Sequence, residues 1–395
     1  MAGRVSGHSR PIRLLMVNQL TINVGFYMLM PYLAAHLTGD LGLAVWVAAL
    51  VLGVRNLCQQ GLFLVGGGLA DRLGYKPMIL TGLLLRTAGF AMLGLVEAVP
   101  ALLAASALTG LAGAFFNPAA RAYLAQEAGE RKVEAFALFN VFYQAGILAG
   151  PPLGLLLNGV AFRLTCLIAA ALFAVLALAQ ARALPPRRGS RAGVPMAADW
   201  RAAFGDRGFR RFALVMTGSY VLGFQVYLSL PLAVPGQAVW IFVVSGAMAV
   251  LGQVKVTAWA AARWTPGQAI TRGLALMGLA FAPPGLMAAG LPATVAVLAA
   301  TVLLTAGSMI VYPFEMAVVA GFGGERIGTY YGLYSTVSGI GVAAGNVLVG
   351  AALEAGLAWW GLVTAGLGCA AGVHLLCRSR HGFSTERVVP PANTG

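Results

Sequence analysis

The stretch GGLADRLGYK, residues 67–76, decides the fold because it places a dense group of charges and glycines between two long apolar runs. Glycine allows a positive φ and lets helix ends approach closely. Asp71, Arg72 and Lys76 favour water and lipid headgroups over hydrocarbon. The stretch therefore predicts a tight turn between two membrane helices.

The composition excludes an ordinary soluble domain. Hydrophobic residues make up 59% of the 395 residues and charged residues 10%, whereas about a quarter of residues are charged in a typical soluble protein. We expect an all-α integral membrane protein with twelve transmembrane helices, since helices of about 20 residues fit this length. The apolar runs that predict them cover 12–37, 43–70, 77–97, 100–120, 134–157, 162–183, 211–233, 238–260, 268–288, 293–317, 327–352 and 358–377.

The net charge of +14 is a topology signal. Nearly all Lys and Arg fall at the N-terminus, in alternate loops, in a middle segment and after the last run, whereas Arg163 lies alone on the opposite side. Basic residues favour the cytoplasmic side of a membrane. We therefore expect both termini in the cytoplasm and no nucleic-acid partner.

A polar segment rich in Pro and Arg divides the chain into two similar halves. The residues from Pro118 through Gly129-Glu130-Arg131 recur from Pro313 through Gly324-Glu325-Arg326, at a constant offset in the sequence. Such internal repeats are typical of transporters built from two related bundles. We predict six-helix bundles at 1–184 and 212–378, a cytoplasmic basic linker at 185–211 and a cytoplasmic tail at 379–395.

The 67–76 turn resembles the G-x-L-a-D-r-x-G-r-k signature of the major facilitator superfamily, which lies between the second and third helices, although Tyr75 stands where a basic residue is usual. GILAGPPLG at 146–154 resembles the G-x-x-x-G-P-x-x-G-G pattern of its drug/proton antiporters, with Leu155 replacing the final glycine. The resemblance implies the major facilitator fold, with two pseudo-symmetric six-helix bundles.

Two further runs, LGVRNLCQQG at 52–61 and RTAGF at 86–90, resemble bacterial multidrug resistance proteins of the MdtH type. One family pattern is broken. Many proton-coupled members carry an arginine four residues before a glycine of the fourth helix, and Ser106 stands there, before Gly110. Proton coupling by that arginine is therefore not expected.

Asp71 is the central candidate for gating. It can accept hydrogen bonds from the N-terminus of a helix in the other half, and the resemblance implies that it latches the outward-facing state. Glycines four apart permit close helix contact and prolines kink a helix, as a rocking interface between two halves needs, although simple packing is the alternative. The predicted gating residues are Gly67, Asp71, Arg72, Gly74, Lys76, Gly146, Gly150, Pro151 and Gly154.

Three basic residues lie within predicted helices. Arg55 and Arg86 are about 24 Å and about 15 Å from the turn at 1.5 Å per residue, and Lys255 lies in the second half. An ionised side chain at such depth costs at least a few kcal/mol, so it should face the bundle interior or a wet cavity. We predict a net positive cavity that prefers an anionic, zwitterionic or oxygen-rich ligand. The alternative is that these bases bond helix carbonyls or Glu315 and only brace the bundle.

Polar residues on several helices are candidates to line the same cavity, although such residues often only bond helices to one another. The predicted substrate-binding residues are Asn23, Tyr27, Arg55, Gln59, Arg86, Asn140, Gln144, Tyr220, Gln225, Lys255, Tyr312 and Tyr334. Asp71 and Glu315 are candidates for proton coupling, because a buried carboxyl can titrate near the working pH. A salt bridge to Lys255 or to a cytoplasmic arginine is the alternative for Glu315.

The sequence contains no G-x-x-x-x-G-K-[ST] loop and no His/Cys/Glu cluster at metal spacing, so we expect neither an ATP-driven pump nor a metalloenzyme, and no cofactor or metal. We expect a monomeric secondary active exporter, driven by protons, of xenobiotics or of an endogenous acidic or chelating product such as a siderophore. The alternatives are a proton-coupled importer of a small anionic metabolite and a membrane receptor that kept the fold and lost transport.

Overall fold

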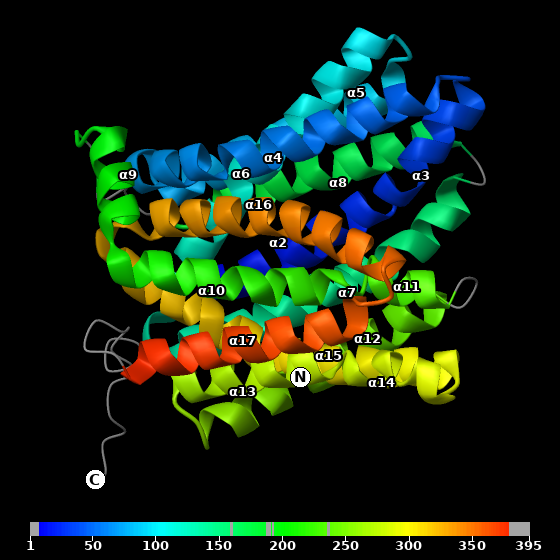
Figure 1. Ribbon diagram of the computed structural model, residues 1–395. Coiled ribbons are helices and arrows are strands. Elements are labelled where there is room, and N and C mark those ends of the chain that lie inside the picture. The colour runs from blue at the N-terminus through cyan, green and yellow to red at the C-terminus, as the bar shows by residue number, and fades with distance from the viewer. Residues whose placement is uncertain (1–7, 159–160, 187–190, 192, 235–237, 379–395) are drawn as a thin grey trace. The chain divides into compact units, whose positions relative to one another are not determined.

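The computed structural model describes residues 8–158, 161–186, 191, 193–234 and 238–378, which form helices joined by short turns (Figure 1). Ten stretches among them are long and apolar enough to cross a membrane. Val99–Leu157 and Ala293–Glu354 each contain two long helices, which brings the described spans to twelve. The predicted all-α membrane protein is confirmed.

The first six spans precede a short helix, α9 (Met196–Gly205), and the other six follow it. The first spans are α2 (Arg10–Tyr27) with α3 (Met30–Ala35) and η1 (His36–Asp40), α4 (Val45–Leu73), α5 (Tyr75–Leu95), α6 (Val99–Ala128), α7 (Lys132–Asn158) and α8 (Phe162–Ala183). The later spans are α10 (Arg207–Phe224) with α11 (Ser229–Ala233), α12 (Ala238–Ala261), α13 (Pro266–Leu279) with α14 (Ala282–Gly285) and η3 (Met287–Ala289), α15 (Ala293–Gly323), α16 (Ile327–Glu354) and α17 (Ala358–Arg378). The predicted linker thus contains a helix, and the predicted tail lies outside the described residues.

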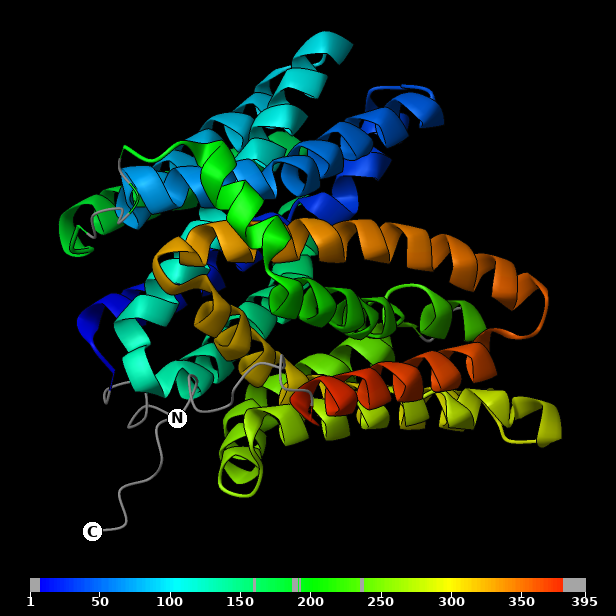
Figure 2. The ribbon, with the colours of Figure 1, turned by 60° about the vertical axis from the view of Figure 1, so that its left-hand side comes forward.

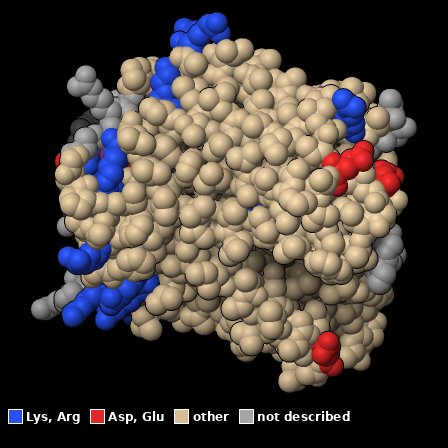
Figure 3. Space-filling view, turned by 90° about the horizontal axis from the view of Figure 1, so that it is seen from above, with Lys and Arg blue, Asp and Glu red and all other residues tan. Residues whose placement is uncertain are grey.

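The surface is suited to hydrocarbon. Large apolar side chains are exposed along the helices, among them Leu57 at 73% and Leu251 at 77%. In the face shown in Figure 3, Lys and Arg gather mainly towards the left-hand side and Asp and Glu towards the right, with a broad uncharged surface between them. This separation of charge is what helices crossing a bilayer require, since only their ends meet water.

Contacts group the chain into two compact units that do not coincide with the two sequence halves. Unit 1 comprises Met1–Ala128, Phe142–Arg201 and Gly323–Thr336, and unit 2 comprises Gly129–Val141, Ala202–Phe322 and Val337–Gly395. Each unit therefore includes one short piece of the other half. The division into bundles at 1–184 and 212–378 describes the sequence halves and stays a prediction.

The two exchanged pieces are counterparts in the internal repeat. Each begins with the sequence Gly-Glu-Arg as a 3-10 turn, η2 (Gly129–Arg131) and η4 (Gly324–Arg326), and continues into a long helix. The glycine that opens each turn has φ +53°, which an L side chain rarely adopts. Figure 2 shows α16, in orange, continuing as one helix from its turn. The repeat seen in the sequence is thus also present in the backbone.

The glycine face of α7 packs against α2 in unit 1. A Cβ added at Gly146 would lie 2.5 Å from Asn23 Cβ, and one at Gly150 would lie 2.6 Å from Tyr27 Cβ. Gly154 continues this face against the backbone just beyond α2. The predicted role of these glycines at a rocking interface between the halves stays a prediction, since the contact that the structure shows is with α2 of the same half.

The α2–α7 contact predicts a matched pair of stability effects. Gly150→Leu should lower the melting temperature of the detergent-purified protein, because an added side chain must displace α2 at a cost of about 1–3 kcal/mol. Gly61→Leu is the control, since nothing lies within 4 Å of a Cβ at Gly61. Equal melting temperatures for the two variants would contradict the contact.

Candidate functional site

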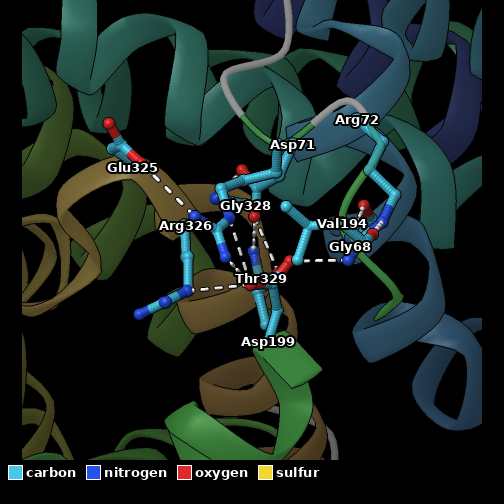
Figure 4. A network of polar contacts seen from close by, with 10 residues as sticks. Gly68, Asp71, Arg72, Val194, Asp199, Glu325, Arg326, Gly328 and Thr329 are labelled. Atoms are coloured by element: carbon cyan, nitrogen blue, oxygen red, sulfur yellow. Dashed lines mark hydrogen bonds and ion pairs between the residues drawn. The ribbon is translucent and has the colours of Figure 1, made fainter. Parts of the chain in front are cut away.

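Asp71 lies in the last turn of α4 in unit 1, and its side chain is fully buried. Its Oδ1 accepts a hydrogen bond from the backbone nitrogen of Gly328 at 2.8 Å. Its Oδ2 accepts from the backbone nitrogen and from Oγ1 of Thr329, each at 2.7 Å (Figure 4). The first turn of α16 has no acid of its own. Since helix N-termini have unpaired N–H groups and favour negative charge, Asp71 supplies the acid that α16 lacks.

Tyr75 adds a further donor to this carboxylate. Its buried hydroxyl donates to Asp71 Oδ1 at 3.1 Å, and Gln126 Nε2 donates to the same hydroxyl at 3.3 Å. Tyr75 is the residue that departs from the family signature. The departure therefore replaces a basic residue with a neutral donor to Asp71.

Glycines allow α4 and α16 to approach at this point. A Cβ at Gly67 would overlap the carbonyl group of Gly328. A Cβ at Gly328 would lie 2.6 Å from Gly67 O and 2.7 Å from Asp71 Oδ1. Neither position can carry a side chain unless the helices separate, so the hydrogen bonds of Asp71 depend on both glycines.

Two other residues of the 67–76 turn shape the end of α4. Gly74 has φ +96°, which ends α4 and lets α5 begin at Tyr75. Lys76 donates from Nζ to the carbonyl oxygen of Ala181, near the end of α8, at 2.7 Å. Lys76 therefore fastens the turn to α8 rather than to α16.

Arg72 joins a buried ionic cluster centred on Asp199 of α9. Arg72 Nη2 donates to Asp199 Oδ2 at 2.6 Å. Arg191 Nη2 and Arg326 Nε donate to Asp199 Oδ1, each at 2.8 Å. Burial by itself would raise the pKa of Asp199, but hydrogen bonds from these three arginines outweigh it and hold the pKa below its usual range. Asp199 is therefore ionised at neutral pH.

Arg55 of α4 is half-buried in unit 1. Its Nη1 donates to Asn56 Oδ1 at 2.6 Å and its Nη2 to Gln59 Oε1 at 2.7 Å. Its guanidinium lies 4.5 Å from the centre of the Phe26 ring, close enough for a cation–π contact. Gln59 thus orients Arg55.

Arg86 of α5 is 7% exposed and lies close to two aromatic rings. Its guanidinium carbon is 6.0 Å from the centre of the Phe116 ring and 5.6 Å from the centre of the Phe173 ring. Its Nε has no hydrogen-bond partner. It lies within electrostatic range of Arg55. Among the described residues, no carboxylate pairs with either arginine. Unit 1 therefore holds two neighbouring cations without a counter-ion.

Lys255 of α12, in unit 2, is exposed, so the expectation that it is a buried base was wrong. Gln253 and Thr257 on the same helix are buried and hydrogen-bonded to each other. Lys255 is two residues from each of them, which is about 200° around a helix of 3.6 residues per turn. It therefore lies on the opposite face of α12.

The other predicted polar residues divide between the two units, and several bond helices together. Asn23 donates to the Tyr143 carbonyl oxygen at 2.9 Å, and Asn140 donates to Gln253 Oε1 at 2.8 Å. In unit 1 the structure places Asn23, Tyr27, Arg55, Gln59, Arg86, Gln144 and Tyr334, and in unit 2 Asn140, Tyr220, Gln225, Lys255, Tyr312 and the buried Glu315. Pro151 lies within α7, and its carbonyl oxygen accepts from Tyr32 Oη at 2.7 Å.

Two residues of the site, Thr329 and Asp199, were not predicted from the sequence. The repeat contained a signal for the first, because Thr329 is the counterpart of Glu134, which is an acid in the first turn of α7. A helix that has lost this acid needs another from elsewhere. Asp199 could have been noticed as an isolated acid among the linker arginines, but its three partners are far apart in sequence.

Comparison with known proteins identifies the family. The model of the Major Facilitator Superfamily matches residues 15–346. The chain belongs to this superfamily. This major facilitator protein is 46% identical over 393 residues to an uncharacterized MFS-type transporter of Mycobacterium tuberculosis (strain ATCC 25618 / H37Rv), with 94% of each chain covered. It is 32% identical over 280 residues to the multidrug resistance protein MdtH of Yersinia pestis (strain Pestoides F), with 69% of this chain and 70% of that one covered.

Solved major facilitator structures share the fold. The TM-score is 0.73 to the human organic anion transporter MFSD10, at 17% identity, with 93% of this chain and 97% of that one covered. It is also 0.73 to the E. coli fucose:proton symporter FucP, at 18% identity, with 92% and 97% covered. The resemblance noted in the sequence is confirmed, and the chain is a multi-pass membrane transporter of this superfamily rather than an enzyme.

The hydrogen bonds between Asp71 and α16 predict a change in crosslinking between α4 and α16. Gln60→Cys and Thr336→Cys place thiols where Thr336 Oγ1 now donates to the Gln60 carbonyl oxygen at 3.2 Å, in a chain whose four native cysteines are replaced by serine. Asp71→Asn should lower the yield with a short thiol crosslinker by about tenfold, because hydrogen bonds to a charged group contribute about 1.5–3 kcal/mol.

The control for that experiment is Asp40→Asn, which changes an exposed acid paired with His36. It should leave the crosslinking yield unchanged. An Asp71→Asn yield equal to that of the control would show that the carboxylate does not hold α16.

Proposed function

We propose that the protein is a secondary active exporter that exchanges small organic molecules for protons by alternating access. The observation that carries the proposal is the set of hydrogen bonds from the start of α16 to Asp71. It joins helix ends from the two sequence halves, and a transporter that rocks its halves must break such a contact once in each cycle. In this proposal Asp71, Gly67 and Gly328 are gating residues.

Export is favoured over import by one comparison. The relative at 32% identity is named a multidrug resistance protein, which supports efflux by this chain. Protons are the proposed coupling ion, and Asp71 and Glu315 are the proposed carriers because both carboxyls are buried within spans. Ser106 is buried and cannot replace the ionisable arginine of many proton-coupled members.

The proposed setting is the inner membrane of a bacterium, with both termini in the cytoplasm and the protein acting as a monomer. The excess of Lys and Arg in alternate loops supports this orientation. The gate at Asp71 then lies on the cytoplasmic side, and the conformation that it stabilises has that side closed.

The proposed substrate carries an acidic group. Arg55 and Arg86 are neighbouring cations in unit 1 that pair with no carboxylate in the described part of the chain, and aromatic rings lie beside both. Such a setting suits an organic anion, because the acid would pair with guanidinium groups while its apolar part contacts the rings. An acidic or chelating metabolite fits this description better than a cationic drug.

A second candidate function is a proton-coupled importer of a small anionic metabolite, which the same two arginines favour equally. The direction of coupling separates the two functions. An importer has no reason to release protons from everted vesicles when substrate is added outside them, whereas an exporter must do so.

The transport test uses everted vesicles from a bacterial host with an acidified interior, followed with a pH-sensitive dye. Addition of acidic compounds from a panel should dissipate the gradient in vesicles that contain the protein. Asp71→Asn should cut the initial rate at least about fivefold without lowering the protein level, because the mutated gate no longer cycles between its states. An unchanged rate in the variant would refute the gating role.

The substrate test measures thermal stabilisation of the purified protein by salicylate and by its neutral analogue salicylamide. Arg86→Gln and Arg55→Gln should each weaken stabilisation by salicylate about tenfold in concentration and leave salicylamide unaffected, since a hydrogen bond to a charge contributes about 1.5–3 kcal/mol. Arg163→Gln, which alters an exposed arginine on α8, is the control. Equal weakening for both compounds would mean that the arginines only support the fold.

A further inference from the structure

Asp199 connects three segments that are distant in the sequence. Arg72 comes from the end of α4, Arg191 from the linker before α9, and Arg326 from η4, immediately before α16. Asp199 itself has no exposed side-chain surface. A buried carboxylate with three guanidinium donors is a built ionic site, and we name these four residues the linker clamp.

A backbone hydrogen bond joins the linker clamp to Asp71, the residue that accepts from the start of α16. The backbone nitrogen of Arg191 donates to the carbonyl oxygen of Asp71 at 3.2 Å. The Arg191 side chain also reaches Glu325 of η4 at 3.4 Å. Arg191 therefore contacts both sides of the hydrogen bonds between Asp71 and α16.

Arg72 is held in place by further hydrogen bonds. Arg72 donates from Nη1 to the Gly68 carbonyl oxygen at 2.7 Å and from Nε to the Val194 carbonyl oxygen at 3.0 Å. A Cβ at Gly68 would lie 3.0 Å from the side chain of Met196 in α9. Figures 1 and 4 show α9 alongside the end of α4. The absent side chain at Gly68 thus lets α9 pack closely on α4.

We propose that the linker is a working part of the gate, in which Asp199 is a positioning residue that holds Arg326, and with it the first turn of α16, against the end of α4. Separation of α16 from α4 then requires Asp199 to release Arg326 or Arg72. Releasing a buried ion pair is unfavourable, so the linker clamp adds to the stability of the latched state. In this proposal the linker connects the two halves and also stabilises the contact between α4 and α16.

The linker clamp does not respond to protons in the working range of pH. The groups that face Asp199 are Arg72, Arg191 and Arg326, with Glu325 beyond Arg191. These arginines hold the pKa of Asp199 below its usual value. Its contribution is therefore present above the ordinary carboxyl pKa of about 3.9 and is lost only as pH falls through a lower value. Asp199 fixes the gate, and another group carries the coupling proton.

The test applies the thiol pair Gln60→Cys and Thr336→Cys to linker clamp variants. Asp199→Asn should lower the crosslinking yield about tenfold, because it leaves three guanidinium groups without their carboxylate. Asp199→Glu should restore part of the yield, since it returns the charge. Glu325→Gln should have little effect, because Glu325 is 71% exposed and its ion pair with Arg191 is long, at 3.4 Å.

Arg326→Gln gives an independent measurement if Asp199→Asn fails to fold. The Arg326 side chain is 33% exposed, and the substitution removes only one of the three arginines that donate to Asp199. It should lower the yield at an unchanged melting temperature. If both variants keep the wild-type yield while Asp71→Asn lowers it, the linker does not belong to the gate. Because crosslinking needs neither substrate nor proton gradient, this outcome is distinct from failure of the proposed export function.

Discussion

One carboxylate at the end of one helix completes the N-terminus of another that is distant in sequence. α16 begins without an acid in its first turn, and Asp71 of α4 accepts from the first backbone N–H groups of that helix. The glycines at 67 and 328 exist at this crossing because any side chain would push the two backbones apart. The close crossing, the buried acid and the nearby ionic cluster all depend on this contact.

The internal repeat shows how the start of α16 differs from its counterpart at the start of α7. In the first half, the helix that follows Gly-Glu-Arg has its own acid, Glu134, whereas its counterpart in the second half has Thr329. Thr329 contributes a hydroxyl donor to Asp71 in place of a charge. The two helix ends are thus similar in sequence and backbone, and the one that carries Thr in place of Glu is the one whose first N–H groups bond to Asp71.

The sequence was a good guide to features that depend on local pattern. Apolar runs predict the spans because each run must cross about 30 Å of hydrocarbon, and the acid in the 67–76 turn predicts a helix N-terminus as partner. Contacts between distant segments were harder to foresee. The partners of Asp199 come from three places along the chain, and the partner of the α7 glycine face is α2, which no spacing within α7 could identify. The prediction that Lys255 is buried failed for a different reason, because helical periodicity alone places Lys255 on the face opposite the buried Gln253.

The buried carboxylates of Asp71 and Asp199 differ in what each would leave unpaired if it were neutralised. Among the described residues, the hydrogen bonds to the Asp71 carboxylate come from uncharged groups, namely two backbone N–H groups, a threonine hydroxyl and a tyrosine hydroxyl. A proton added to Asp71 would strand no cation in a dry environment. A proton added to Asp199 would leave three arginines without the negative charge that they now contact. The structure thus pairs one buried carboxylate held by uncharged donors with another held by three cations, and only in the second would neutralisation leave guanidinium groups without their counter-charge.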